Sequence, residues 1–228
     1  MVTNVNLAAP IGALALLGAG MLFLIFVFVL IFSLIRTSSG LAKLSALAIA
    51  VIGGAYLLAL LGFSLSSKEQ VLVRGDEKHF CELDCHLAYS VSDVRDAKTI
   101  GEGERQVAAA GVFRLVTIQT RLDPETIGSN RGDSLLYPNS RSVSITDAGG
   151  NEYFPAAAAE NVLYKTHAAG TPMTIPLRPG ERYSTVVVFD LPPGIQRPTL
   201  LIREGETLTH LVIGHENSPL HKKVRFLL

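Results

Sequence analysis

The stretch IGALALLGAGMLFLIFVFVLIFSLI at residues 11–35 decides the first part of the fold. It carries no charge, and at about 1.5 Å per residue a helix over it extends about 37 Å, more than the ~30 Å hydrocarbon core of a bilayer. The stretch LSALAIAVIGGAYLLALLGF at residues 44–63 predicts a second span, which we place at 44–64. Residues 36–43 between them are few and polar. The sequence therefore predicts an antiparallel transmembrane hairpin.

A cleaved signal peptide is the alternative interpretation of the first apolar stretch. Signal peptides have a basic beginning and an apolar region of about 7–15 residues. Residues 1–10, which we expect to be a tail, contain no Lys or Arg, and the apolar stretch that follows is much longer. We therefore expect the first helix to stay in the membrane.

The charges predict how the hairpin is oriented. Only Arg36 and Lys43 of the 20 Lys and Arg precede residue 68, and all 20 Asp and Glu follow it. The positive-inside rule places the loop at 36–43 in the cytoplasm. We expect a two-pass protein of the bacterial inner membrane with its C-terminal domain in the periplasm. Because acidic and basic residues nearly balance in that domain, we expect no nucleic-acid partner.

After a tether at residues 65–76, the pattern at 77–228 is that of short strands separated by turns. We expect a single all-β antiparallel sandwich, since no βαβ rhythm is present. Only residues 156–161 have the pattern of a short helix. The expected strands are residues 87–91, 112–120, 142–146, 152–154, 183–189, 200–202, 208–213 and 224–228.

The order of these strands, with Leu177-Arg178-Pro179-Gly180-Glu181 before the Val-rich strand at 183–189, resembles immunoglobulin-like extracellular domains of unknown function in bacterial lipoproteins and membrane-anchored proteins. The resemblance covers about 110 residues. It implies an immunoglobulin-like sandwich that acts as a binding or structural module without known catalytic residues.

The layout of a two-helix hairpin followed by an exported sandwich is similar to that of subunit II of haem-copper oxidases. The copper site of that family uses Cys-x-x-x-Cys-x-x-x-His-x-x-Met. This chain has Cys81 and Cys85 at the right spacing, but Tyr89 and Ser92 stand where the family has His and Met. The layout matches and the copper motif does not.

The most unusual stretch contains both cysteines, flanked by two histidines: His79, Cys81, Cys85 and His86. In an oxidising compartment two cysteines close in sequence most simply form a disulfide. Along an extended strand their Cα atoms would be about 13 Å apart, beyond the ~7 Å limit, so the chain must turn between them. Two thiolates and two imidazoles also suit zinc or copper. Three interpretations remain open: a disulfide, which needs no cofactor; a metal site; and two free thiols.

Other candidate residues lie in the helices and loops. A stripe of small residues, Ala46, Ala50 and Gly54, predicts close helix packing, either within the hairpin or against a larger membrane complex. Ser134 in Gly-Asp-Ser-Leu lacks the late Asp-x-x-His of the hydrolases that share this signature, so we expect no catalysis. Candidate interaction-loop residues, from the two polar loops, are Asn130, Arg131, His215, Asn217 and His221.

These patterns predict a non-enzymatic scaffold or accessory subunit with no small-molecule substrate. Its expected partners are the lipid bilayer and an integral membrane complex of respiratory or photosynthetic type, contacted through sheet edges and loops. The alternative is a metal-binding or redox domain centred on the cysteine and histidine cluster.

Overall fold

The computed structural model describes residues 2–80, 87–124 and 132–228. The chain divides into two compact units. One, the sandwich unit, contains Met1–Asn4, Glu69–Glu206 and Lys223–Leu228; the other, the helix unit, contains Val5–Lys68 and Thr207–Lys222. The chain therefore leaves and re-enters the sandwich unit on both sides of the helices and again near its C-terminal end.

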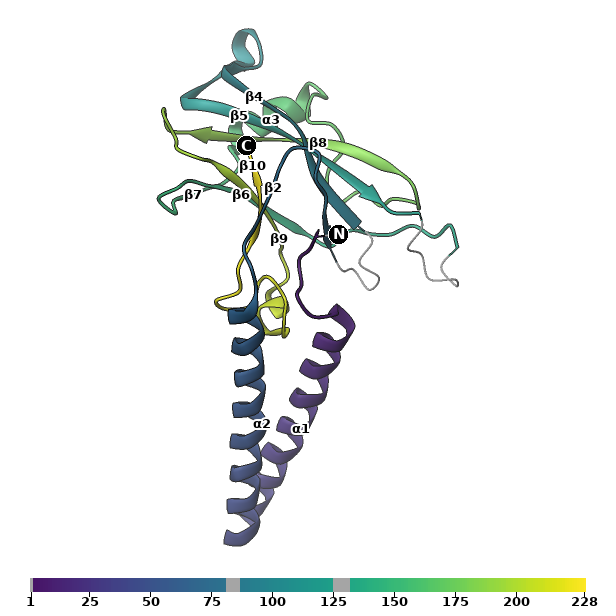
Figure 1. Ribbon diagram of the computed structural model, residues 1–228, viewed down its shortest axis with the longest axis vertical. Helices are drawn as coiled ribbons and strands as arrows, with labels where there is room; N and C mark the ends of the chain where they lie inside the picture. Colours follow the sequence, from purple (N-terminus) through teal and green to yellow (C-terminus); the bar gives the residue numbers. More distant parts are fainter. Residues whose placement is uncertain (1, 81–86, 125–131) are drawn as a thin grey trace. The chain divides into compact units, whose positions relative to one another are not determined.

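Two long antiparallel helices dominate the helix unit: α1, Ala9–Ile35, and α2, Ser39–Ser66 (Figure 1). Pro10 lies in the first turn of α1, where its missing N–H has no helical partner to lose. The first helix follows the expected span closely. The second begins five residues earlier than expected, at Ser39, because the short connection leaves Leu41, Ala42 and the exposed Lys43 free to continue the helix.

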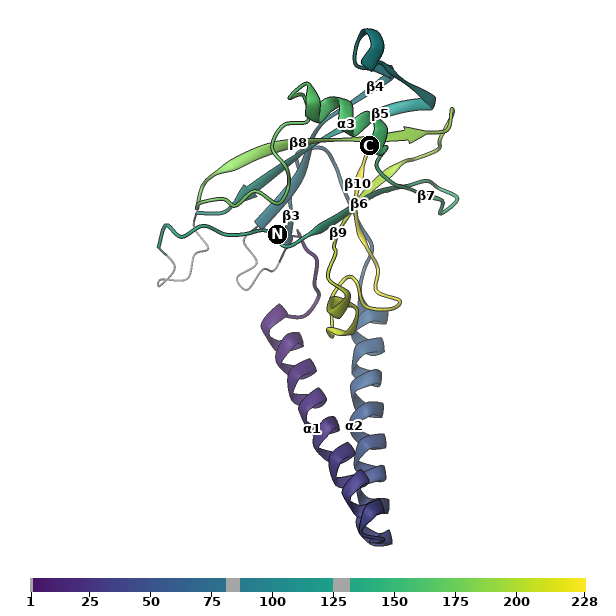
Figure 2. The ribbon, with the colours of Figure 1, turned by 180° about the vertical axis from the view of Figure 1, so that it is seen from behind.

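Two five-stranded sheets form the sandwich unit (Figure 2). The first has the order β1-β3-β4-β5-β8 and the second β2-β10-β9-β6-β7. The expected hairpin at 142–154 is present as β6 and β7. The strands are β1 Val2–Thr3, β2 Gln70–Leu72, β3 Lys78–Phe80, β4 Leu87–Ile100, β5 Val107–Leu122, β6 Arg141–Thr146, β7 Glu152–Tyr153, β8 Arg182–Leu191, β9 Thr199–Glu204 and β10 Val224–Leu227.

The sheets are mixed, which corrects the expectation of a purely antiparallel sandwich. The strand β1 runs parallel to β3, and β2 runs parallel to β10. Neither β1 nor β2 is joined to its neighbour by a hairpin, because β1 precedes α1 and β2 directly follows α2. A strand that enters a sheet from a distant part of the chain is free to pair in parallel.

The main core lies between the two sheets, and a smaller one lies between the first sheet and the helix α3, Ala157–Lys165. The long strands β4 and β5 serve both cores, because alternate side chains point to opposite faces of a sheet. The main core is built around Phe80, Leu87, Tyr89, Ile118, Ile145, Phe189, Leu200, Ile202 and Phe226. The smaller core contains Ile100, Phe113, Ala159, Val162, Leu163, Ala169 and Val188.

Two segments differ from their sequence-based predictions. Residues 208–213 were expected to form a strand, but the structure has a short 3₁₀ helix, η2, at Thr207–Leu211, within the helix unit. The expected tether at 65–76 contains the end of α2 and all of β2. At 208–213 the prediction of an ordered segment was right and its type was wrong, whereas at 65–76 the prediction of a tether missed β2, because its partner β10 is distant in sequence.

Candidate functional site

Of the predicted cysteine and histidine cluster, the structure places His79. It lies on β3 and is 5% exposed. Its Nε2 is 3.8 Å from Oε2 of Glu77. Burial is the main cause that lowers the His79 pKa, so the neutral imidazole is favoured. Cys81, Cys85 and His86 lie outside the described residues.

Glu77 beside this histidine is held by Arg121. The guanidinium donates two hydrogen bonds, Nε to Oε1 at 2.8 Å and Nη2 to Oε2 at 2.7 Å. These bonds lower the Glu77 pKa, which keeps the carboxylate charged. A cavity of about 480 Å³ adjoins the pair; it is lined by Val2, Leu72, Gly75, Asp76, Glu77 and His79.

Within residues 2–80, 87–124 and 132–228, no three side chains are grouped as metal ligands. A neutral imidazole is compatible with metal binding, but the bidentate ion pair with Arg121 already occupies Glu77. The metal or redox hypothesis therefore stays a prediction. Elemental analysis of the purified full chain decides it: stoichiometric zinc or copper supports it, and its absence from freshly purified protein counts against it.

The predicted loop residues His215, Asn217 and His221 are buried rather than exposed. They are 5%, 6% and 9% exposed. The Asn217 backbone N–H donates to Nδ1 of His215 at 3.0 Å, and its side chain donates to Oγ1 of Thr209 at 2.8 Å. These residues hold the local loop together. Asn130 and Arg131 lie outside the described residues.

These residues belong to Thr207–Lys222, which we call the cap segment because it covers the ends of both helices. The Asn6 backbone N–H donates to the Gly214 carbonyl oxygen at 2.9 Å, and its side chain donates to the Phe63 carbonyl oxygen at 2.8 Å. The second bond goes to one of the last four carbonyls of α2, which lack a backbone N–H partner within the helix; the Ser66 hydroxyl donates to the same oxygen. The Lys222 N–H donates to Oγ of Ser67 at 2.8 Å.

Two further contacts place the cap segment against the helix sides. The Tyr56 hydroxyl donates to the Leu211 carbonyl oxygen at 2.6 Å. Gly12 is buried against Ile213, and a Cβ there would lie 2.7 Å from the Ile213 carbonyl oxygen. Sequence reasoning did not identify Asn6 or Tyr56. The available signal was their polarity, since each stands out beside or within an almost wholly apolar stretch.

The stripe Ala46, Ala50 and Gly54 lies on the exposed side of α2. The opposite side packs toward α1, where a Cβ on Gly53 would lie 3.9 Å from the Phe23 ring. A Cβ on Gly54 would meet nothing within 4 Å. The stripe is therefore available to a further helix and is not used within the hairpin.

Most of the outer surface of both helices is apolar. Leu14, Phe28, Ile35 and Leu58 are 68%, 69%, 75% and 75% exposed. Both helices are long and apolar enough to cross a membrane, and in their most apolar windows 0% and 11% of residues are buried. A helix in the core of a water-soluble domain buries much more of its apolar surface.

Comparison with known proteins gave no match to a protein-family model and no match among curated proteins. Two solved structures are similar to parts of the chain. One is MPT63, a secreted protein from Mycobacterium tuberculosis, with 13% identity over 72% of this chain and 100% of that one, and a TM-score of 0.43. The other is a conserved hypothetical protein from Bacillus anthracis, with 14% identity over 58% and 88% of the two chains and a TM-score of 0.37.

Proposed function

We propose that this chain is a non-enzymatic scaffold or accessory subunit, anchored by α1 and α2 in a bacterial inner membrane, whose immunoglobulin-like periplasmic sandwich binds a larger respiratory or photosynthetic membrane complex. The observation that carries this proposal is the exposed apolar surface of both helices. Leaving that surface in water would cost about 25 cal/mol per Å². A bilayer removes this cost, and helices of 27 and 28 residues extend about 40 Å, enough to span it.

The orientation rests on Arg36, which directly follows α1, and Lys43, which lies near the start of α2. Both favour the cytoplasmic side, and long exported domains translocate largely regardless of their own charge. A C-terminal alkaline phosphatase fusion is therefore expected to be active. A fluorescent C-terminal GFP fusion with an inactive phosphatase fusion would reverse the assignment.

The exposed small-residue stripe on α2 supplies the contact within the membrane. Small residues let the backbones of two helices approach closely, which increases van der Waals contact where lipid gives no hydrophobic driving force. Because Ala46, Ala50 and Gly54 face away from α1, a helix of the partner complex is the occupant that the scaffold hypothesis predicts.

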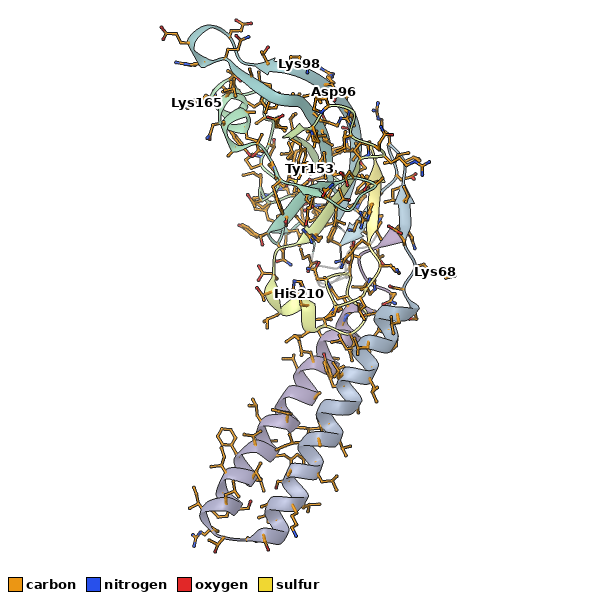
Figure 3. The ribbon with its side chains drawn as sticks, turned by 90° about the vertical axis from the view of Figure 1, so that its left-hand side faces the viewer. Lys68, Asp96, Lys98, Tyr153, Lys165 and His210 are labelled. Atoms are coloured by element: carbon orange, nitrogen blue, oxygen red, sulfur yellow. The ribbon has the colours of Figure 1, made fainter. Side chains whose placement is uncertain are left out.

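The free edge of β4 supplies a contact in the sandwich. The strand β3 pairs with β4 only at Leu87–Tyr89, whereas β5 pairs along nearly its whole length. Beyond Val91, β4 carries charges of both signs, including Asp96 and Lys98 (Figure 3). Asp96 accepts two hydrogen bonds from Arg114, at 2.8 and 2.9 Å. A charged edge of this kind disfavours non-specific strand pairing and favours a partner whose charges are complementary to it.

Replacing Ala50 by Leu is expected to weaken the retention of the partner complex about tenfold, equivalent to about 1.4 kcal/mol. The larger side chain would hold the partner helix away from the stripe. The matched control is Val51→Leu, since Val51 is 59% exposed and lies about 100° further around the helix. The measurement is the amount of co-purifying complex after extraction in a gentle detergent, quantified by mass spectrometry.

If both variants retain the partner complex equally well, the stripe is not part of the interface. A lone chain with no co-migrating partner, in gentle detergent and in native membranes alike, would contradict the scaffold function itself.

A further inference from the structure

Within the helix unit, α1 and α2 lie close together near their connection and diverge toward the cap segment (Figures 1 and 2). The diverging part encloses a groove of about 430 Å³. Both helices and the cap segment line it, with Leu16, Ala19, Gly20, Phe23, Ile52, Gly53, Tyr56 and Leu211. The groove owes its width to Gly20 and Gly53, which project no side chain into the space between the helices.

The cap segment holds the groove open. Gly12 is buried against the Ile213 backbone, so this part of the cap segment lies directly against α1. On the other side, the Tyr56 hydroxyl donates to the Leu211 carbonyl oxygen at 2.6 Å, which ties the same segment to α2. The helices therefore cannot close over the groove without breaking these contacts. The hydrogen bond also satisfies the one side-chain hydroxyl in the lining.

A groove with such a lining selects an apolar occupant. Water needs two to four polar partners to be stable in a cavity, and this lining offers it none that is free. An empty groove would forfeit the dispersion contacts of its walls. A partner helix about 10 Å across would occupy about 420 Å³ for each turn, so this groove holds roughly one turn and cannot admit a helix along its length.

The cap segment also shows where lipid comes into contact with the protein. It carries three exposed leucines, Leu208, Leu211 and Leu220, at 71%, 49% and 66% exposure. Exposed apolar side chains at the end of a membrane-length helix are typical of the boundary between headgroups and acyl chains. Leu211 belongs both to these exposed leucines and to the lining of the groove. The groove therefore opens at the boundary between headgroups and acyl chains. His210, beside it, is exposed as well (Figure 3).

We propose that the groove between α1 and α2 binds one acyl chain of a membrane phospholipid, which completes the packing of the helix pair. This inference rests on the proposed membrane insertion. The lipid chain fills the space that Gly20 and Gly53 leave, and its headgroup lies at the level of the cap segment. The bound lipid differs from the surrounding bilayer lipid because it contacts both helices and Leu211 at once.

The test uses the full chain in phosphatidylcholine vesicles that contain phosphatidylcholine with a photoreactive diazirine on one acyl chain. After irradiation, the adducts are mapped by peptide mass spectrometry. We expect adducts on Leu16, Phe23 and Ile52, and we expect them to persist when the vesicles are diluted with unlabelled lipid before irradiation. Adducts on the outward residues Leu14, Phe28 and Leu58 should fall in proportion to the dilution.

Gly53→Leu is expected to reduce the persistent adducts about fivefold or more, because its side chain occupies the groove. The matched control is Gly54→Leu at the adjacent position, where a Cβ meets nothing within 4 Å on the outer side of α2. Gly20→Leu provides a second way to fill the groove, again with no atom within 4 Å of the added Cβ. Thermal unfolding of each variant shows whether the fold is retained.

The possible results distinguish failure of the lipid site from failure of membrane insertion. Adducts on outward residues with none that persist in the groove would overturn the lipid site and leave membrane insertion intact. Equal adduct yields in Gly53→Leu and Gly54→Leu would also overturn the lipid site. No adduct on either helix would contradict membrane insertion, and with it the proposed function.

Discussion

Replacing Gly170 by Ala should lower the free energy of unfolding of the sandwich by about 2–5 kcal/mol, the sum of left-handed strain and overpacking. Gly170 has a φ of 71° and forms an isolated bridge with Thr185 at the outer side of β8. A Cβ there would overlap the Ser184 carbonyl oxygen. That oxygen also accepts a hydrogen bond of 2.9 Å from the Thr171 N–H, so it cannot move away without losing the bond.

The matched control for this variant is Gly150→Ala. Gly150 has a similar backbone conformation, with a φ of 83°, but a Cβ there would meet nothing within 4 Å. We expect a loss of about 1–2 kcal/mol from the left-handed conformation alone. Thermal unfolding of the full chain in detergent, followed by circular dichroism, measures both. At about 2–4 °C per kcal/mol, Gly170→Ala should melt roughly 4–20 °C lower than the unchanged protein. Equal melting temperatures for the two variants would show that the close approach costs nothing.

Replacing Lys78 by Ala should destabilise the sandwich by about 3–5 kcal/mol, because two buried carbonyls lose a donor and the lost alkyl chain leaves a cavity. Lys78 lies on β3 and its side chain is fully buried. Its Nζ donates to the Ile202 carbonyl oxygen at 2.7 Å and to the Val224 carbonyl oxygen at 3.4 Å. Both acceptors belong to the other sheet. The ammonium also lies 4.9 Å from the centre of the Phe80 ring.

The position of the two acceptors explains the size of this effect. The strands β10 and β9 pair at Phe226–Leu200 and Leu227–Thr199. In the same register Val224 comes opposite Ile202, where the Lys78 ammonium bonds both carbonyls. One side chain thus joins the two sheets at the point where β9 and β10 meet. Without it, buried carbonyls lose a donor, at about 1–3 kcal/mol each.

The variant Lys78→Met separates the ammonium from its carbon chain. Methionine keeps most of the buried volume and donates no hydrogen bond, so we expect a smaller loss than with alanine, about 1–3 kcal/mol. Urea titration of the full chain in detergent, at one fixed pH, gives the unfolding free energies. A Met variant as stable as the unchanged protein would mean that packing alone, without the charge, holds the sheets together.

The sequence predicts best those features that depend on neighbouring residues. The two helices follow from uninterrupted apolar runs, and β8 follows from its valines, because each pattern is complete within a short stretch. The second half of β4 was not predicted, since Asp96 and Lys98 interrupt the apolar alternation. That half is held in the sheet by its pairing with β5, which no local pattern reveals.

Features that depend on distant partners were missed or left open. Lys78 has the composition of a surface residue, and its burial becomes clear only when the carbonyls of β9 and β10 are placed beside it. His215 and His221 lie in a polar stretch that was expected to be a surface loop, yet both are buried. The spacing of Ala46, Ala50 and Gly54 defines a helix face but does not tell which face meets α1.

The position of β1 in the sequence affects when the sandwich can form during synthesis. Residues 2–3 precede α1 but pair with β3 of the sandwich, and β10 at Val224–Leu227 completes the other sheet. Ribosomes deliver the first of these strands before either helix and the last after all the other strands of the sandwich. The second sheet therefore cannot be completed until β10 has been made, and long-range closure of this kind is slow. In a chain inserted with the orientation proposed above, residues 2–8 would cross the bilayer, and their lack of charged side chains would keep that transfer inexpensive.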